Sequence, residues 1–280
     1  MLEFLFLPFI ACLILTGIHA YLGIHVIERK VIFVDLSLAQ IAALGTALGA
    51  IVGFDYGGTV SYASGLIFTL VGATIFALTR VRNERVPQEA IIGIVYAVSA
   101  AAFILIMDRA PEGAEKIKGM LVGSILYVDW ATILKTGGLY TLIGLFHFIF
   151  RRKFITISVD PEQAFNQGMA VRFWDFLFYA SFGFVVTSSV LIAGVLLVFS
   201  YLVVPSVCAV LFTNSFKARL MIGWSLGFLA SLFGIIASVA FELPTGAAIV
   251  CTFGLLLVLS ALGRLIVSWL ILISNSTIEQ

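Results

Sequence analysis

Long runs of apolar residues, separated by short polar or charged breaks, follow one another along almost the whole chain. A helix needs about 20 apolar residues to cross the roughly 30 Å hydrocarbon layer of a bilayer, and each run of that length predicts a membrane-spanning helix. The runs cover residues 4–27, 31–53, 59–79, 90–107, 131–150, 173–192, 194–212, 220–241 and 246–263. The pattern therefore predicts an all-α, polytopic integral membrane protein, a bundle of 8–9 transmembrane helices that forms a single domain over residues 1–280.

The stretch 173–212 is the ambiguous part of this pattern, because Asp175 is its only charged residue. It is either one very long helix or two passes with a tight break near Ala193–Gly194. With two passes, all but four of the 16 lysines and arginines fall in loops on one side. The four exceptions are Arg109, Lys116, Lys118 and Lys135. Because positive charge accumulates in cytoplasmic loops, this bias favours nine passes, or eight with a re-entrant segment, with the N-terminus outside and the C-terminus in the cytoplasm.

Composition supports this class and excludes several others. Apolar side chains make up 61% of the chain and charged ones 11%, whereas soluble domains are about half apolar and a quarter charged. The net charge of +1 leaves no basic face to neutralise phosphates, which excludes a nucleic-acid-binding protein. The cysteines Cys12, Cys208 and Cys251 lie far apart within apolar runs, so we expect them in the core rather than in disulfides or a zinc site.

Glycines recur every four residues on two of the predicted spans. Gly45, Gly49 and Gly53 share one helix face, and Gly223 and Gly227 share another. Small residues at this spacing let helix backbones approach closely in lipid, where no hydrophobic effect drives helices together. The pattern predicts a compact bundle.

Polar residues open the second predicted span directly after the basic pair Arg29–Lys30. Asp35 is favoured there by the helix dipole and can also pair with either basic residue. Alternatively, Asp35, Ser37 and Gln40 line a substrate pathway, in which Asp35 and Gln40 are the candidate metal ligands. These two lie about 140° apart around a helix, so a tight metal site built only from them is a weak hypothesis.

The longest polar stretch, 151–171, contains the signals of a short helix on the predicted cytoplasmic side. Asp160 fits an N-cap, Pro161 the first helical position and Glu162 an acidic first turn, while Gly168 fits the C-terminal stop. We expect a helix of about two turns outside the membrane, either as a connector or as a docking element for a soluble partner.

Pro205 lies at membrane depth in the run 194–212. Its ring removes one helix hydrogen bond, and the freed backbone group must be satisfied by neighbouring helices or by water in a cavity. We therefore predict a structural kink along the pathway at this residue.

The chain contains no GxxxxGK[ST] phosphate loop and no plausible spacing of nucleophile, base and orienting group. It is therefore not expected to be an enzyme or to carry a cofactor of its own, and any active transport would need an energy source in another chain. A secondary transporter is another possible class. Such a protein would need charge pairs within the membrane, and the predicted spans contain almost none.

Taken together, these segments resemble the permease subunits of ATP-binding-cassette importers for zinc, manganese and iron. In that family a Gly, two basic residues, an aromatic, then Gly-Asp-Ala-Leu-Ser/Ala-His and a downstream Gly open an early span. Arg29–Lys30, Phe33, Ala39 and Gly45 match this signature without gaps. Further matches are 89–94, 121–125, 160–164 with Gly168, 194–198 with Pro205, and 243–250. The similarity covers about residues 10–262.

The resemblance implies a type II importer fold, similar to the cobalamin and ferric siderophore permeases, in the inner or plasma membrane. Two permeases, expected to form a homodimer, would work with cytoplasmic ATPases that bind ATP and with an extracytoplasmic solute-binding protein. The segment 153–172 would be the coupling segment that seats in the ATPase. The residues implied in coupling are Asp160, Pro161, Glu162, Ala164 and Gly168.

The chain departs from the family at the residues thought to contact the metal. Leu36 stands at the family's Asp and Gln40 at its His, while Asp35 falls on its Gly. Leucine cannot ligate a cation, and glutamine is a poor zinc ligand beside imidazole. Either Asp35 substitutes through a local change of register, or weak oxygen contacts suffice, or the cargo differs. The leading hypothesis is import of divalent zinc, manganese or iron; the alternative is a metal chelate or small organic substrate.

Overall fold

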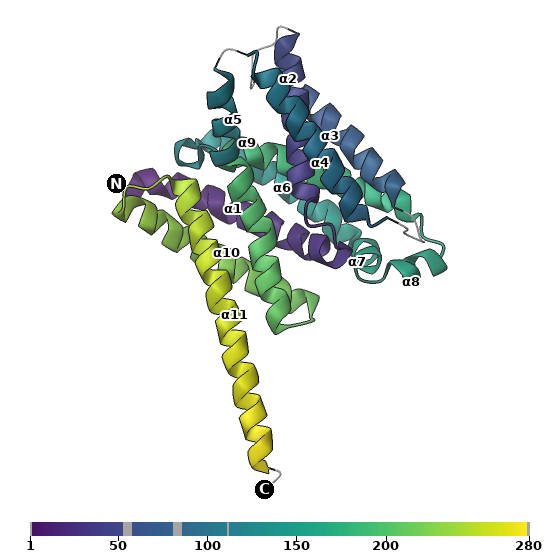
Figure 1. Cartoon of the computed structure of the whole chain (residues 1–280), viewed down its shortest axis with the longest axis vertical. Helices are drawn as coiled ribbons and strands as arrows, with labels where there is room; N and C mark the ends of the chain where they lie inside the picture. Colours follow the sequence, from purple (N-terminus) through teal and green to yellow (C-terminus); the bar gives the residue numbers. More distant parts are fainter. Residues whose placement is uncertain (1, 53–57, 81–85, 111, 279–280) are drawn as a thin grey trace.

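The computed structural model of the chain describes residues 2–52, 58–80, 86–110 and 112–278, and these form helices joined by short connections (Figure 1). The elements are α1 (Leu2–Arg29), α2 (Val34–Ile51), α3 (Thr59–Thr79), α4 (Gln88–Met107), α5 (Gly113–Val122), the 3₁₀ turn η1 (Ile125–Tyr127), α6 (Trp130–Ile149), α7 (Arg151–Val159), α8 (Pro161–Asn166), α9 (Val171–Phe212), α10 (Phe216–Ala240) and α11 (Thr245–Ile278). The all-α, multi-pass architecture predicted from the apolar runs is confirmed.

Seven helices in the described ranges are long and apolar enough to cross a membrane: α1, α3, α4, α6, α9, α10 and α11. The 18-residue α2 is shorter, but at 1.5 Å per residue it still extends about 27 Å, close to the bilayer's hydrocarbon thickness. The chain is therefore a multi-pass membrane protein.

The 42-residue α9 is two helices joined at a break. Gly194 has a non-helical backbone there, with φ 76° and ψ 160°. An unbroken helix of 42 residues would extend about 63 Å, roughly twice the hydrocarbon thickness. The predicted break at Ala193–Gly194 is confirmed. If each half of α9 is counted separately and α2 is included, the described helices supply nine candidate spans.

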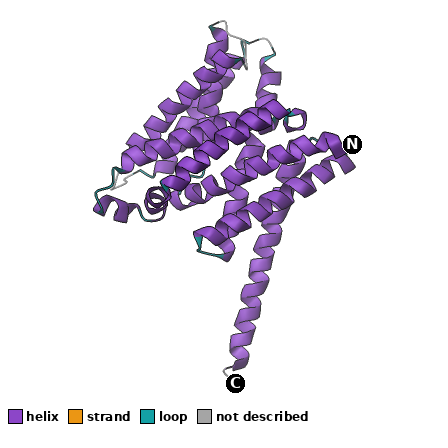
Figure 2. Cartoon of the chain, turned by 180° about the vertical axis from the view of Figure 1, so that it is seen from behind, coloured by secondary structure: helices purple, strands orange, loops and turns teal. Residues whose placement is uncertain are grey.

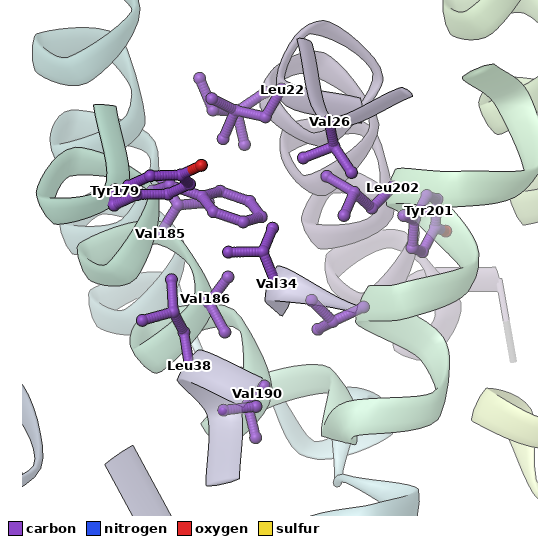
Figure 3. Close-up of a cluster of buried hydrophobic side chains, with 14 of the residues drawn as sticks. Leu22, Val26, Val34, Leu38, Tyr179, Val185, Val186, Val190, Tyr201 and Leu202 are labelled. Carbon is purple, nitrogen blue, oxygen red and sulfur yellow. The ribbon is translucent and has the colours of Figure 1, made fainter. Parts of the chain in front are cut away.

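The core is built around α9. Figure 3 shows Leu22 and Val26 of α1, Val34 and Leu38 of α2 and a run of α9 side chains from Tyr179 to Leu202 facing one another. Tyr179 and Leu38 are fully buried. Because α9 contacts both the α2–α3 pair and the α10–α11 pair, it joins the two sides of the bundle.

Glycines bring the surrounding helices close, as the four-residue spacing predicts. A Cβ on Gly45 would lie 2.7 Å from Phe68 of α3, and one on Gly227 would lie 2.4 Å from Thr16 of α1. Both approaches are too short for any side chain at the glycine. Gly53, the third residue of the first predicted glycine face, lies outside the described residues.

Three helical segments go beyond the predicted spans. α5 and α7 are short and carry several charged residues, so hydropathy does not reveal them. α11 continues to Ile278, well past the predicted end at residue 263, and leaves the bundle as a single helix (Figure 2).

The prediction that all three cysteines lie in the core is wrong for one of them. Cys12 and Cys208 are buried, but Cys251 is exposed. Cys251 lies on α11, which contacts the bundle mainly through α9 and α10, so one face of this helix is left without a neighbour.

Candidate functional site

A cavity of about 290 Å³ lies between α2, α3, α5 and the first half of α9. Small and polar side chains line much of it, which leaves space that larger residues would fill. The lining residues are Ala39, Ala42, Ala43, Thr46, Tyr62, Lys116, Gly119, Met120, Gly123, Ser124, Thr187, Val190 and Leu191. Its size fits a small cargo or a partly hydrated ion.

One face of α2 forms a wall of this cavity. The lining positions Ala39, Ala42, Ala43 and Thr46 recur at three- and four-residue spacing and so share one side of the helix. Asp35 lies one turn before Ala39 on the same face. The predicted pathway residue Asp35 therefore continues the stripe that borders the cavity.

Asp35 is buried without a partner. Only 1% of the residue is exposed, and neither carboxylate oxygen has a hydrogen-bond partner in the described chain. The expected pairing with Arg29 does not occur, because Arg29 contacts Asp175 instead. An unpaired buried carboxylate is costly, and such groups in membrane spans commonly mark transport routes.

Ser37 and Gln40 lie on other faces of α2 than the one that lines the cavity. Ser37 is fully buried, and its hydroxyl also has no hydrogen-bond partner in the described chain, but it lies about 160° around α2 from Ala39. Gln40 is 7% exposed and does not line the cavity. Within the described ranges no three His, Cys, Asp or Glu side chains gather closely enough to hold a metal ion.

The entry of the chain into α2 is held by α4. The backbone N–H of Phe33 donates a hydrogen bond of 2.9 Å to the Glu89 carboxylate. Glu89 lies in the first turn of α4, so α2 and α4 begin beside one another. This contact fixes where α2, and with it Asp35, starts.

The short helix predicted after residue 160 is present as α8. The Asp160 side chain accepts a hydrogen bond of 2.8 Å from the Gln163 N–H, Pro161 is the first helical residue, and Gly168 has a left-handed φ of 71°. Ala164 is fully buried, whereas Glu162 is exposed. The helix is therefore seated on the bundle through one side and presents its polar side outward.

α9 leaves its helical geometry at Gly194, whereas Pro205 lies within the second half of the helix. Pro205 is buried beside α10, 3.7 Å from where a Cβ on Gly223 would lie. The kink along the substrate pathway that we predicted at Pro205 therefore stays a prediction.

Sequence reasoning missed a buried ionic cluster that joins distant segments. Asp175 of α9 pairs with Arg29 at the end of α1 and with Arg80 at the end of α3. The expectation that the spans hold almost no charge pairs is therefore wrong at this end of the bundle. The only signal in the sequence was Asp175 itself, the single charge in 40 apolar residues, and nothing local identified its partners.

The three histidines are core residues that make side-chain hydrogen bonds. His25 Nδ1 lies 2.8 Å from Ser158 Oγ, and His147 Nε2 lies 2.8 Å from Ser181 Oγ. His19 is fully buried near Ser189. They pack among serines and aromatic rings rather than around the cavity.

Comparisons with known proteins agree with this architecture. A profile of the ABC 3 transport family matches residues 1–264. The manganese transport system membrane protein MntC of Listeria innocua is 27% identical over 205 residues, which cover 69% of this chain and 71% of that protein. The manganese import system permease protein ScaB of Streptococcus gordonii is 24% identical over 258 residues, 92% of this chain and 90% of that one.

The fold is also that of a solved structure, PsaBC from Streptococcus pneumoniae in complex with Fab. The TM-score is 0.76 with 24% sequence identity, and the alignment covers 92% of this chain and 91% of that chain. The shared helical arrangement thus extends over nearly the whole molecule.

Proposed function

This chain belongs to the ABC 3 transport family, and we propose that it is the permease subunit of an ATP-driven importer for a divalent transition metal ion. The observation that carries the proposal is the family match over residues 1–264, which includes the cavity, α8 and all the candidate spans except the last few residues of the α11 span. The names of two relatives point to manganese among the candidate cargoes, with zinc and iron as the other candidates.

The permease supplies the route, and its partners supply energy and cargo. ATP is bound and hydrolysed by a cytoplasmic ATPase, a solute-binding protein delivers the metal from outside, and a second permease, a further copy of this chain, completes the route. In this arrangement the single domain, residues 1–280, lies in the inner or plasma membrane, with its N-terminus outside the cell membrane and its C-terminus in the cytoplasm. The basic bias of the loops supports this orientation.

The segment 153–172 is the coupling segment in this proposal. The exposed side of α8, with Glu162, faces the ATPase, and Ala164 holds the helix against the bundle. The Asp160 cap, Pro161 and the left-handed Gly168 fix where the helix starts and ends. A short helix with both ends fixed by the local sequence is suited to act as a rigid contact.

The metal route follows the Asp35 face of α2 into the cavity. Asp35 offers two oxygens that have no hydrogen-bond partner among the described residues, and a passing cation can contact such oxygens briefly. The Gln40 side-chain oxygen is the second candidate contact, although α2 turns it away from the cavity face. Transport favours such weak contacts, because a tightly held ion would not leave.

Reconstitution tests this proposal. The permease, its cognate ATPase and its solute-binding protein are placed in liposomes, and uptake of radioactive manganese, zinc and iron is measured with and without ATP. We expect ATP-dependent accumulation of at least one metal. An ATPase variant that binds but does not hydrolyse ATP serves as the control. Failure of all three metals to accumulate contradicts the proposal.

A second candidate cargo is a metal chelate or small organic molecule in the same importer. The composition of the cavity favours it, because the lining residues that the structure describes include Lys116 but no carboxylate, imidazole or thiol. A cargo that brings its own ligands needs none from the wall. Competition decides between the two, because excess free manganese blocks uptake of labelled manganese only if the free ion is the cargo.

A further inference from the structure

The segment that leads into α8 is tied to the membrane helices by the buried ionic cluster, defined here as Arg29, Arg80, Asp175 and Ser158. Ser158 lies near the end of α7, and its hydroxyl accepts a hydrogen bond of 2.8 Å from Arg29 Nε. Arg29 also pairs with Asp175 through its guanidinium, and the side chains of both residues are completely buried. The cluster thus joins α1, α7 and α9 at one point.

Arg80 adds α3 to the same point. Its guanidinium lies 3.3 Å from the Asp175 carboxylate and donates to the backbone carbonyl of Ile157 in α7 at 3.4 Å. Arg80 is the C-cap residue that directly follows α3. Two arginines therefore share one carboxylate, and both also contact the last turn of α7.

Two continuous helices run from this cluster to the cavity. Asp175 and Thr187 lie on the unbroken first half of α9, about 18 Å apart at 1.5 Å per residue. Thr187 lines the cavity, and so does Tyr62 on α3, the helix that Arg80 ends. α3 and α9 also contact one another through Thr69 and the cavity-lining Thr187, whose hydroxyls lie 3.2 Å apart.

The geometry of the cluster makes it stiff. Arg29 lies over the Phe178 ring at 4.0 Å, so the guanidinium is held by an aromatic face as well as by oxygen atoms. Separating a buried charge from its partner leaves an uncompensated charge, which is strongly unfavourable. A displacement of α7 is therefore more easily passed on to α3 and α9 than absorbed by breaking the contacts.

We propose that the buried ionic cluster is the link that transmits movement of the coupling segment to the helices that line the cavity. This inference rests on the proposed function, in which α8 contacts the ATPase. Arg29, Arg80, Asp175 and Ser158 are positioning residues in this role, since none of them lines the cavity or is exposed to a partner. α8 follows directly on α7, so a push on α8 reaches Ser158 first.

A cargo-independent measurement tests the link. In the complete complex, a Thr46→Cys substitution places a thiol in the cavity wall, in a chain whose exposed Cys251 is replaced by serine. The labelling rate of this thiol is measured with and without ATP. We expect ATP to change the rate in the otherwise unmodified complex. In the Asp175→Asn and Ser158→Ala variants, the change in labelling rate caused by ATP should be about tenfold smaller, while ATP hydrolysis continues.

A neighbouring ion pair provides the matched control. Glu28 also lies in the last turn of α1, but it pairs with Arg219 of α10, and within the described residues no hydrogen bond or ion pair joins it to α7. Glu28→Gln should keep the full labelling response. Arg29→Lys retains the charge but loses the planar guanidinium that contacts Ser158 and Asp175 together. This variant should keep only part of the labelling response.

The outcomes separate the link from the proposed function. If Asp175→Asn is not recovered in the membrane, Ser158→Ala decides, since it removes one hydroxyl and no charge. A full labelling response in Ser158→Ala, or an equal loss in Glu28→Gln, overturns the link. A complex whose labelling responds to ATP as expected but which imports no metal contradicts the proposed cargo and still supports the link.

Discussion

Gly123 and Gly194 meet backbone to backbone where the end of α5 crosses the break in α9. A Cβ on Gly123 would lie 2.2 Å from the Ala193 carbonyl carbon, and one on Gly194 would lie 2.4 Å from the Gly123 nitrogen. Both residues have a left-handed φ, 70° and 76°. The Ser124 N–H completes the contact by donating to the Ile192 carbonyl at 3.1 Å. The turn between the two halves of α9 therefore depends on a second glycine far away in the sequence.

Replacing Gly194 with alanine should destabilise the protein strongly. The φ/ψ pair alone costs about 1–3 kcal/mol for a residue with a Cβ, and the clash with Gly123 adds to it. Thermal unfolding in detergent should show a clearly lower midpoint. Gly93→Ala in α4 is the control, because a Cβ there has nothing within 4 Å and the backbone is helical. Equal midpoints for the two variants would mean that the contact does not constrain α9.

Replacing Asp35 with asparagine should separate stability from transport. The substitution removes a buried charge that has no hydrogen-bond partner in the described chain, so the midpoint of thermal unfolding should stay level or rise. Metal uptake should fall by at least about tenfold, the lower end of what loss of an outer-shell partner costs a metal site. Both quantities are measured on the reconstituted complex.

Ser37→Ala is the matched control for the Asp35 variant. Ser37 is equally buried and lies two residues away, but on another face of α2. We expect wild-type uptake from it. A loss of uptake as large as that of Asp35→Asn would show that general packing at the start of α2, rather than the carboxylate, controls transport.

Replacing Asp160 with alanine should weaken binding of the permease to the ATPase. Loss of the N-cap costs the helix about 1 kcal/mol, so α8 should fray at the end nearest α7. Less ATPase should then co-purify with the permease. Asp129 makes the same kind of cap on α6, accepting from the Thr132 N–H at 2.9 Å. Asp129→Ala loses an equivalent bond and should retain the ATPase; a loss from both variants would argue against a coupling role for α8.

Cysteine labelling of intact cells should reveal the orientation of the chain. Lys118 lies on α5 and Arg152 on α7, and both are exposed. In a chain whose native cysteines are replaced by alanine, a membrane-impermeant thiol reagent should label Lys118→Cys but not Arg152→Cys. After the cells are opened, both should react. The reverse pattern would place the N-terminus in the cytoplasm.

Much of the fold could be predicted from the chain because the signals are local. The length of an apolar run decides whether a helix can cross a bilayer, so the spans follow from hydropathy alone. The caps of α8 lie within nine residues, from Asp160 to Gly168, and their preferences act on the backbone beside them. Even the break at Gly194 was predicted, since two passes over 173–212 place most of the basic loops on one side of the membrane.

The site was less accessible to sequence reasoning, since it depends on which helix faces meet. Asp35 and Ser37 are both polar residues in the first turns of α2, two positions apart, yet only Asp35 shares the face that borders the cavity. α5 supplies a wall of the cavity and was not predicted, because a ten-residue helix with several charges has neither the length nor the apolarity of a span.

What the sequence by itself determined is the class of protein, the approximate positions of its spans, and the capped helix α8, all of which follow from residues near one another in the chain. The tertiary structure alone decided the partners. Arg29 had an acid six residues away in Asp35, but it pairs with Asp175, 146 residues away. Asp35 is buried and has no hydrogen-bond partner in the described chain. The physical reason is that pairing inside a bundle depends on the rotation of each helix about its axis, and that rotation is set by close packing with other helices rather than by local sequence.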